Sequence, residues 1–299
     1  MRNTGKATGY ELPSLVRVEK VSMRQAGCLI LTGPSSCGKG EVAAALCRVM
    51  NIPPSDHLSM GEILRQSFQK AKDDASYAEL LASKYRISAA ANIFHCLDTT
   101  EHLSNKVRSH LPDLESYFRR TGMAEFVSQL EWLEFCTMTG RLVPDRWTQE
   151  FVAAHIEHSA ELRTRPFILD GYPRTVAAAK HLIEFLKRVE IPVIKVLHLS
   201  ISKQEMIIRA KGRGRADDDD SSLVSRFNFY IENVQPSVDY MKRELGSHAI
   251  ALIDAHQPVY EGEGDAKHFC LHESIRAVCA SALRALGVPR IVLRDLLEQ

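Results

Sequence analysis

Short continuous apolar runs recur along the chain and predict buried strands. They occupy Gly27–Thr32, Phe167–Asp170, Val193–Ile201 and Ala249–Ile253. A run of this length without polar alternation is typical of a strand that is covered on both faces, as in a parallel sheet. The sequence therefore favours a sheet at the centre of the molecule.

Helical periodicity fills the intervals between these runs. Residues 38–50 place Val42, Leu46 and Val49 on one face, a helix is expected to run through Arg188, and another is expected over residues 274–286. Between Pro54 and Pro144 only Pro112 interrupts the chain, so we expect a cluster of helices there. Alternating strands and helices predict an α/β fold of three layers, a parallel sheet with helices on both faces.

Composition restricts the function. The 299 residues carry 38 Lys plus Arg against 37 Asp plus Glu, a formal net charge of +1. This balance argues against a general nucleic-acid binder. No apolar run is long enough for a membrane span, and seven scattered cysteines suit a reducing compartment. We expect a cytoplasmic monomer with residues 1–26 as an extension, and organellar targeting stays open.

A phosphate-binding motif follows the first predicted strand. Residues 33–40 read GPSSCGKG, which matches GxxxxGK between a strand and a helix. Glycines allow backbone N–H groups to surround phosphates, and Lys39 can reach the β and γ phosphates. The alternative is a glycine-rich turn with a surface lysine. Gly40 stands where most such loops have Ser or Thr, so the usual direct magnesium ligand is missing.

Four further motifs follow in order: LSMGEILR at residues 58–65, GRLVPD at 140–145, DGYPRT at 170–175 and GRADD at 214–218. With the GKG ending, they make residues 27–286 resemble the adenylate kinases, in the short-lid type. The resemblance implies a P-loop kinase domain over 27–299. Within it lie a helical acceptor-binding region over 59–140 and a short lid over 209–226.

Such enzymes reversibly transfer a phosphoryl group from ATP, with Mg²⁺, to a nucleoside monophosphate. Arginine suits this chemistry because its planar, permanently charged guanidinium binds phosphate oxygens. By resemblance, the catalytic residues are Lys39, Arg174, Arg213, Arg215 and Arg226. The ATP site comprises Gly33, Ser36, Cys37, Gly38, Lys39, Gly40, Glu41, Arg209, Arg213 and Gln257. The monophosphate site comprises Ser59, Met60, Arg65, Val143, Gly171, Arg174, Arg215 and Arg226.

Asp170 ends a predicted strand and is expected to hold magnesium through water molecules, because magnesium keeps much of its hydration shell. Its alternative role is the N-cap of the following helix. No general base is needed, since a phosphate acceptor is already largely ionised at neutral pH.

The sequence departs from the family pattern at several positions. Glu41 and Met60 each replace a threonine, and Ala178 stands where adenylate kinases carry the glutamine that reads the acceptor adenine. A helical insertion over about 66–125 enlarges the acceptor-binding region. We expect this insertion to be an additional structural element that packs on the acceptor side. The alternatives are a lid and a protein-binding surface.

These departures leave the acceptor open. AMP is favoured, a pyrimidine or deoxynucleoside monophosphate is the alternative, and a nucleotide-binding pseudokinase is the rival from another class. The histidine pair His155 and His158, and the group His268, Cys270 and His272, are interpreted as ordinary surface residues because neither offers four metal ligands.

Overall fold

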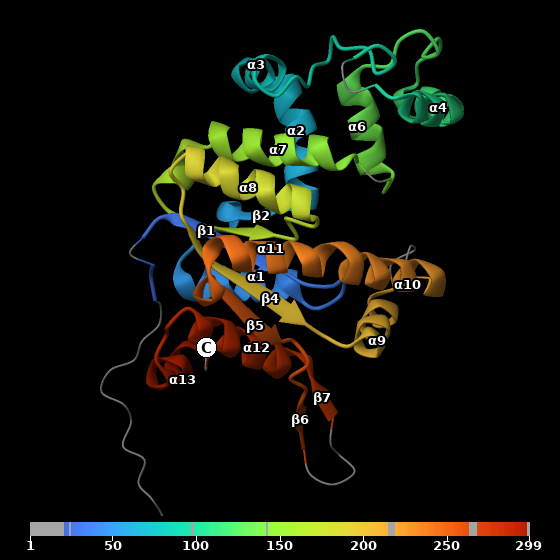
Figure 1. Ribbon diagram of the computed structural model, residues 1–299. Helices are drawn as coiled ribbons and strands as arrows, with labels where there is room; N and C mark the ends of the chain where they lie inside the picture. Colours follow the sequence, from blue (N-terminus) through green and yellow to red (C-terminus); the bar gives the residue numbers. More distant parts are fainter. Residues whose placement is uncertain are drawn as a thin grey trace, which may run out of the picture.

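The computed structural model describes residues 21–23, 25–96, 99–141, 143–214, 219–262 and 268–297. Its centre is a five-stranded parallel sheet in the order β2-β3-β1-β4-β5 (Figure 1). The strands are β1 (Gly27–Thr32), β2 (His57–Ser59), β3 (Pro166–Asp170), β4 (Val193–Ser200) and β5 (Ile250–Asp254). Four of them confirm predicted strands. Strand β2 was not predicted, because three residues are too few to show a pattern.

Both faces of the sheet are buried. In β1, Cys28 and Ile30 belong to one hydrophobic core, while Leu29 and Leu31 belong to the other. This division follows from the strand period of two residues. Because apolar side chains on both faces need a cover, helices pack above and below the sheet in Figure 1. The predicted fold class is confirmed.

Separate sets of helices build the two outer layers. The first core includes α7 (Asp145–His158), α8 (Val176–Arg188) and α11 (Gln235–Leu245), and the second includes α1 (Lys39–Met50), α12 (Leu271–Ala285) and α13 (Arg290–Leu297). In α1, Val42, Leu46 and Val49 face the second core, as their spacing predicts. Beside the sheet lie α9 (Lys203–Arg213) and α10 (Asp220–Phe229), which overlap the two ends of the predicted lid over 209–226.

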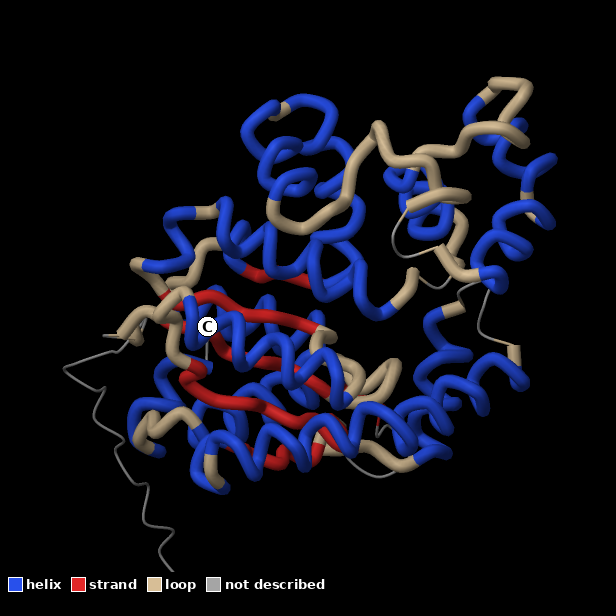
Figure 2. The backbone as a smooth tube through the Cα atoms, turned by 45° about the horizontal axis from the view of Figure 1, so that its top comes forward, coloured by secondary structure: helices blue, strands red, loops and turns tan. Residues whose placement is uncertain are grey.

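The predicted helical cluster consists of five helices among the described residues: α2 (Met60–Asp73), α3 (Ala75–Ser83), α4 (Glu101–Ser109), α5 (Leu111–Phe118) and α6 (Gln129–Met138). Helices α2 and α3 are separated at Asp74, whose carboxylate accepts backbone N–H bonds from Ser76 and Tyr77 and so begins the second helix. Helices α3, α4 and α6 lie farther from the sheet than α7 and α8 (Figures 1 and 2).

Most of the apolar side chains at the start of the insertion are buried. The buried ones are Tyr77, Leu81, Tyr85, Ile87, Ile93 and Phe94, whereas Leu80 is partly buried. Leu97 lies outside the described residues. Residues 84–96 and 99–100 form no helix, so this part of the insertion is less helical than its periodicity predicts.

The C-terminal region holds elements that the sequence did not predict. Strands β6 (Val259–Glu261) and β7 (His268–Cys270) pair antiparallel after β5, and α13 follows α12. His272 therefore lies on α12 rather than in a loop. His155 is 8% exposed, so its interpretation as a surface histidine is wrong: its helix α7 buries that face against the first core.

Three further observations concern the described residues. None of their helices is long and apolar enough to cross a membrane. Within the same ranges, no three His, Cys, Asp or Glu side chains are grouped in a way that could hold a metal ion. All seven cysteines are free thiols.

Candidate active site

The loop between β1 and α1 has the backbone that the GxxxxGK pattern predicts. Gly33 has φ +148°, and a Cβ at this position would lie 2.4 Å from the carbonyl oxygen of Leu199 on the neighbouring strand β4. Gly38 has φ +87° and forms the N-cap of α1. Both conformations favour glycine, which explains the spacing of the two residues.

Lys39 lies with its ammonium group inside this loop. The Nζ atom donates hydrogen bonds to the carbonyl oxygens of Pro34 at 2.8 Å and Gly33 at 3.2 Å, and it lies 3.6 Å from Cys37 Sγ. The lysine thus places a positive charge where the loop backbone surrounds it. Phosphate oxygens can compete for these donors more strongly than neutral carbonyls, because hydrogen bonds between ionised groups are stronger.

The other loop side chains differ in burial. Cys37 is buried, and burial raises the pKa of its thiol although the nearby Lys39 charge opposes the rise. The Ser36 hydroxyl is buried without a hydrogen-bond partner. Gly40 and Glu41 are exposed at the start of α1. The Glu41 carboxylate lies beside the loop, because a Cβ on Gly38 would be 3.9 Å from its Oε2.

Asp170 lies next to this loop, at the carboxyl end of β3. It pairs with Leu31 of β1 on one side and with Ser59 of β2 on the other, and it is 8% exposed. Its Oδ2 atom is 3.2 Å from His57 Nε2, while Oδ1 is buried without a partner. A buried carboxylate oxygen without a partner suits a hydrated cation, which supplies the missing donors through its water molecules.

The alternative role of Asp170 as a helix N-cap is wrong. The N-cap of α8 is Thr175, whose hydroxyl accepts a hydrogen bond from the Ala178 backbone N–H at 3.0 Å. In the turn before it, Gly171 has φ +73°, and the Arg174 Nε donates to the Gly171 carbonyl oxygen at 2.8 Å. Arg174 is exposed beside Asp170.

The predicted acceptor residues lie on β2, α2 and the chain before α7. The Ser59 hydroxyl accepts a bond from the Glu62 backbone N–H and caps α2. Met60 and Val143 are partly buried against the first core. Arg65 is half exposed, and its guanidinium pairs with the Glu62 carboxylate at 2.7 Å. Glu62 therefore holds Arg65, which lies one helical turn farther along α2.

The arginines of the predicted lid are described to different extents. Arg209 connects α9 with the chain after β5, because it donates to the Glu205 carboxylate at 2.6 Å and to the Ala255 carbonyl oxygen at 3.0 Å. Arg226 is partly buried on α10. Arg215 lies outside the described residues, and Arg213 is described only as the last residue of α9.

Gln257 follows β5, as expected, but its side chain faces the protein. Its Nε2 donates to the Asp254 carbonyl oxygen at 2.6 Å and to the Ser281 hydroxyl of α12 at 3.1 Å. The side chain thereby ties the 255–258 loop to α12. The backbone of Gln257, rather than its side-chain amide, is therefore the part that a ligand could contact.

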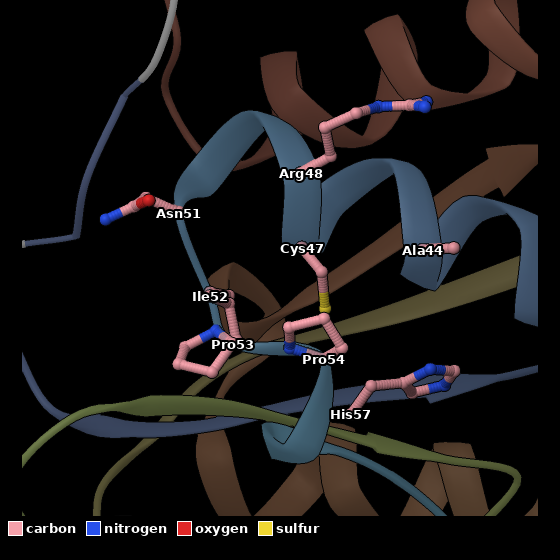
Figure 3. A pocket seen from close by; sticks show the side chains of 8 residues that line it. All are labelled: Ala44, Cys47, Arg48, Asn51, Ile52, Pro53, Pro54 and His57. Carbon is pink, nitrogen blue, oxygen red and sulfur yellow. The ribbon is translucent and has the colours of Figure 1, made fainter.

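A cavity of about 510 Å³ lies at the opposite end of α1 from the phosphate loop (Figure 3). Its lining residues come from α1 and from the chain up to β2: Ala44, Cys47, Arg48, Asn51, Ile52, Pro53, Pro54 and His57. In Figure 3 the Cys47 sulfur points toward Pro54, while the Arg48 side chain points away. His57 is the member of this lining that also contacts Asp170.

The sequence analysis missed His57. The signal that could have found it is its place two residues before Ser59, on the strand that pairs with β3. In a parallel sheet, residues at this position lie near the end of the neighbouring strand. The short strand was not predicted, so this proximity could not be inferred.

The comparisons with known proteins agree with this geometry. A sequence model of the family "Adenylate kinase" matches residues 120–245, which include the 170–175 turn, α9 and α10. The adenylate kinase of Mycobacterium marinum (strain ATCC BAA-535 / M) is 28% identical over 227 residues, 76% of this chain and 92% of that protein. The chain is similar to adenylate kinases over most of its length.

Two other adenylate kinases show comparable or higher sequence identity. The adenylate kinase of Mycolicibacterium vanbaalenii is 29% identical over 217 residues, 73% of this chain and 87% of that protein. The adenylate kinase of Mycobacterium tuberculosis (strain ATCC 25618 / H37Rv) is 38% identical over 106 residues, 36% of this chain and 58% of that protein. This similarity supports phosphoryl transfer to a nucleoside monophosphate by a nucleotide-binding protein.

Proposed function

We propose that this protein reversibly transfers the γ-phosphoryl group of MgATP to AMP. One observation carries the proposal: the ends of the adjacent strands β1 and β3 bring the Lys39 loop and the Asp170 carboxylate together. At this edge, Ser36 Oγ and Asp170 Oδ1 are both buried without partners. Buried polar atoms usually have partners, so two such oxygens favour a site that a hydrated metal nucleotide completes.

The residues present fit magnesium bound through water. Gly40 has no hydroxyl, so this loop lacks the direct ligand of most phosphate loops, and Asp170 is the carboxylate available. His57 holds Oδ2 of Asp170, which leaves Oδ1 toward the incoming hydrated ion. When bound, magnesium neutralises charge on the phosphate groups.

The transfer itself requires positioning and charge rather than a proton acceptor. Lys39 exchanges its bonds to the Gly33 and Pro34 carbonyl oxygens for phosphate oxygens of ATP. Arg174 and Arg226 then neutralise the charge that spreads over the transferred group. Arg65 holds the acceptor phosphate, in competition with its present partner Glu62. The acceptor phosphate attacks in its ionised form, so no general base takes part.

AMP is the favoured acceptor because GRLVPD resembles the adenylate kinase branch, and because the relatives above are named adenylate kinases. Ala178 is 0% exposed in the first core, so its side chain does not contribute to reading the base. A site that discriminates by hydrogen bonds needs donors and acceptors at the base edge. We therefore expect weaker preference for adenine than an amide at this position would give.

A panel of acceptors tests the proposal. Purified protein with MgATP is assayed for diphosphate formation with AMP, dAMP, CMP, UMP and GMP, and ATP hydrolysis without acceptor is measured in parallel. We expect AMP to give the highest kcat/KM and hydrolysis to be far slower than transfer. A higher kcat/KM for CMP or UMP would replace AMP with a pyrimidine acceptor. MgATP binding without transfer to any of the five would contradict the kinase proposal and favour the pseudokinase.

A further inference from the structure

A buried hydrogen-bonded pair connects the sheet with the helix that follows the predicted lid. His198 of β4 and Tyr230 are 6% and 5% exposed, and His198 Nε2 lies 2.9 Å from the Tyr230 hydroxyl. Their rings lie nearly parallel, with an interplanar angle of 8° and centroids 5.9 Å apart. Burying two polar side chains costs free energy unless the hydrogen bond between them is kept. The pair is therefore a well-defined contact.

The histidine end of this pair lies beside the phosphate loop. His198 is in register with Thr32, the last residue of β1, and Gly33 begins the loop. Burial lowers the pKa of His198 to about 4, and the Lys39 charge contributes in the same direction, whereas Asp239 opposes it. The imidazole is therefore neutral at physiological pH and lies within the electrostatic reach of the loop lysine.

The tyrosine end lies one helical turn after Arg226. Helix α10, the π-helical segment Tyr230–Val234 (η3) and α11 follow one another without a break, and Tyr230 is the first residue of the π-helical segment. Its backbone N–H bonds to the carbonyl oxygens of Arg226 and Phe227. Segments of π-helix are rare and occur often at functional sites, because an inserted residue changes the direction of the side chains around it.

The Tyr230 hydroxyl has a second hydrogen-bond partner. The amide nitrogen of Gln235 can only donate, and it lies 3.4 Å from the Tyr230 hydroxyl. A hydroxyl donates one hydrogen bond and accepts two, so it bonds to Gln235 and to His198 Nε2 at the same time, whichever tautomer the imidazole adopts. Replacing either side chain with a hydrocarbon leaves the other buried group without this partner.

We propose that His198 and Tyr230 are positioning residues that hold α10, and with it Arg226, at a set place relative to the phosphate loop. The proposal rests on the proposed function, in which Arg226 contacts the transferred phosphate. A displacement of about 1 Å of a positioned group can reduce a rate up to a hundredfold, so a loosened contact should appear in kcat. The pair acts through α10 and need not touch either nucleotide.

Two substitutions break the pair and one keeps it. Tyr230→Phe and His198→Leu remove the bond, whereas His198→Gln retains an acceptor near the Nε2 position. Tyr77→Phe is the matched control, because Tyr77 is also fully buried and its hydroxyl lies 2.9 Å from Ser67 in the insertion. Each variant is measured for kcat, for the affinity of the free enzyme for MgATP and for Tm.

We expect Tyr230→Phe and His198→Leu to lower kcat about tenfold, as the loss of about one hydrogen bond in positioning would do, with MgATP affinity changed less than about twofold. His198→Gln should recover most of kcat. Tyr77→Phe should lower Tm to a similar extent with kcat unchanged. If Tyr230→Phe lowers Tm as the control does and leaves kcat unchanged, the pair is only structural and the proposal is overturned.

Hydrogen exchange separates this proposal from the proposed function. Without nucleotide, amides of residues 220–229 should exchange faster in Tyr230→Phe than in wild type, while those of α3 stay unchanged. If wild type transfers no phosphoryl group, the proposed function fails, and the exchange of α10 still reports whether the pair holds this helix. Unchanged exchange in α10 would overturn the positioning role whatever the activity.

Discussion

Lys39 is the residue whose removal tests the phosphate loop most directly. Within the described part of the chain, its ammonium group donates hydrogen bonds to groups of the loop itself: the carbonyl oxygens of Gly33 and Pro34 and the sulfur of Cys37. Lys39→Met keeps the length of the side chain and removes the charge. We expect the β1-loop-α1 backbone to persist, because Gly33 and Gly38 set its conformation independently of the lysine.

Two magnitudes follow from these contacts. Loss of a preorganised charge at the transition state costs about 3–4 kcal/mol, so kcat should fall at least a hundredfold. The two hydrogen bonds to carbonyl oxygens are only partly buried, so the free energy of unfolding should fall by about 1–2 kcal/mol. The variant should therefore remain folded while its activity nearly disappears.

The assay needs a lysine that makes the same kind of bond elsewhere. Lys195 on β4 donates to the His248 carbonyl oxygen at 2.6 Å, near the amino end of the strand and away from the phosphate loop. Lys195→Met should lose similar stability with unchanged kcat. Turnover with MgATP and AMP, urea unfolding and MgATP affinity are measured for both variants. If Lys39→Met keeps more than a tenth of wild-type kcat, the assignment of this loop to phosphate binding is wrong.

Three further predictions concern charge. Glu41→Thr removes an exposed carboxylate beside Gly38. Because this negative charge repels phosphate groups, the Kd for MgATP should fall severalfold in the variant. An unchanged Kd would show that the carboxylate does not affect the phosphates. Arg141, two residues before Val143, pairs with Asp113 of the insertion at 3.2 Å. Asp113→Asn should raise KM for AMP by less than about fivefold and leave KM for ATP unchanged. Equal changes in the two KM values would contradict a role on the acceptor side. Burial lowers the pKa of His155 and His198 from 6.5 to about 4, so the unfolded chain binds more protons than the folded protein between these pH values. The free energy of unfolding should therefore decrease as the pH falls from about 7 to 4. An equal free energy of unfolding in urea at pH 7 and at pH 5 would refute this.

Local sequence was sufficient to predict the architecture. Apolar runs of strand length and helical periodicity determine which segments are buried, and these signals lie within a few residues of each other along the chain. The same holds for the phosphate loop, where Gly33 and Gly38 are needed by the local backbone. The β6–β7 hairpin and β2 were missed because three-residue strands are defined by their partners rather than by a pattern of their own.

Local sequence patterns did not predict the contacts between segments that are distant in the chain. His57 and Asp170 are 113 positions apart in the chain, and His198 and Tyr230 are 32 apart, yet each pair lies within 3.2 Å. Such a contact depends on strand register and on how a helix crosses the sheet, and both are set by packing of the whole core.

What the sequence by itself determined is therefore the order of the longer strands and helices, the backbone of the glycine-rich loop and the resemblance to adenylate kinases. The tertiary structure decided which side chains face one another: that Asp170 has a free buried oxygen rather than a helix cap, that Gln257 turns into the protein, and that His155 is buried. The physical reason is that backbone conformation is largely a local property, whereas burial and hydrogen-bond partners are properties of the packed molecule.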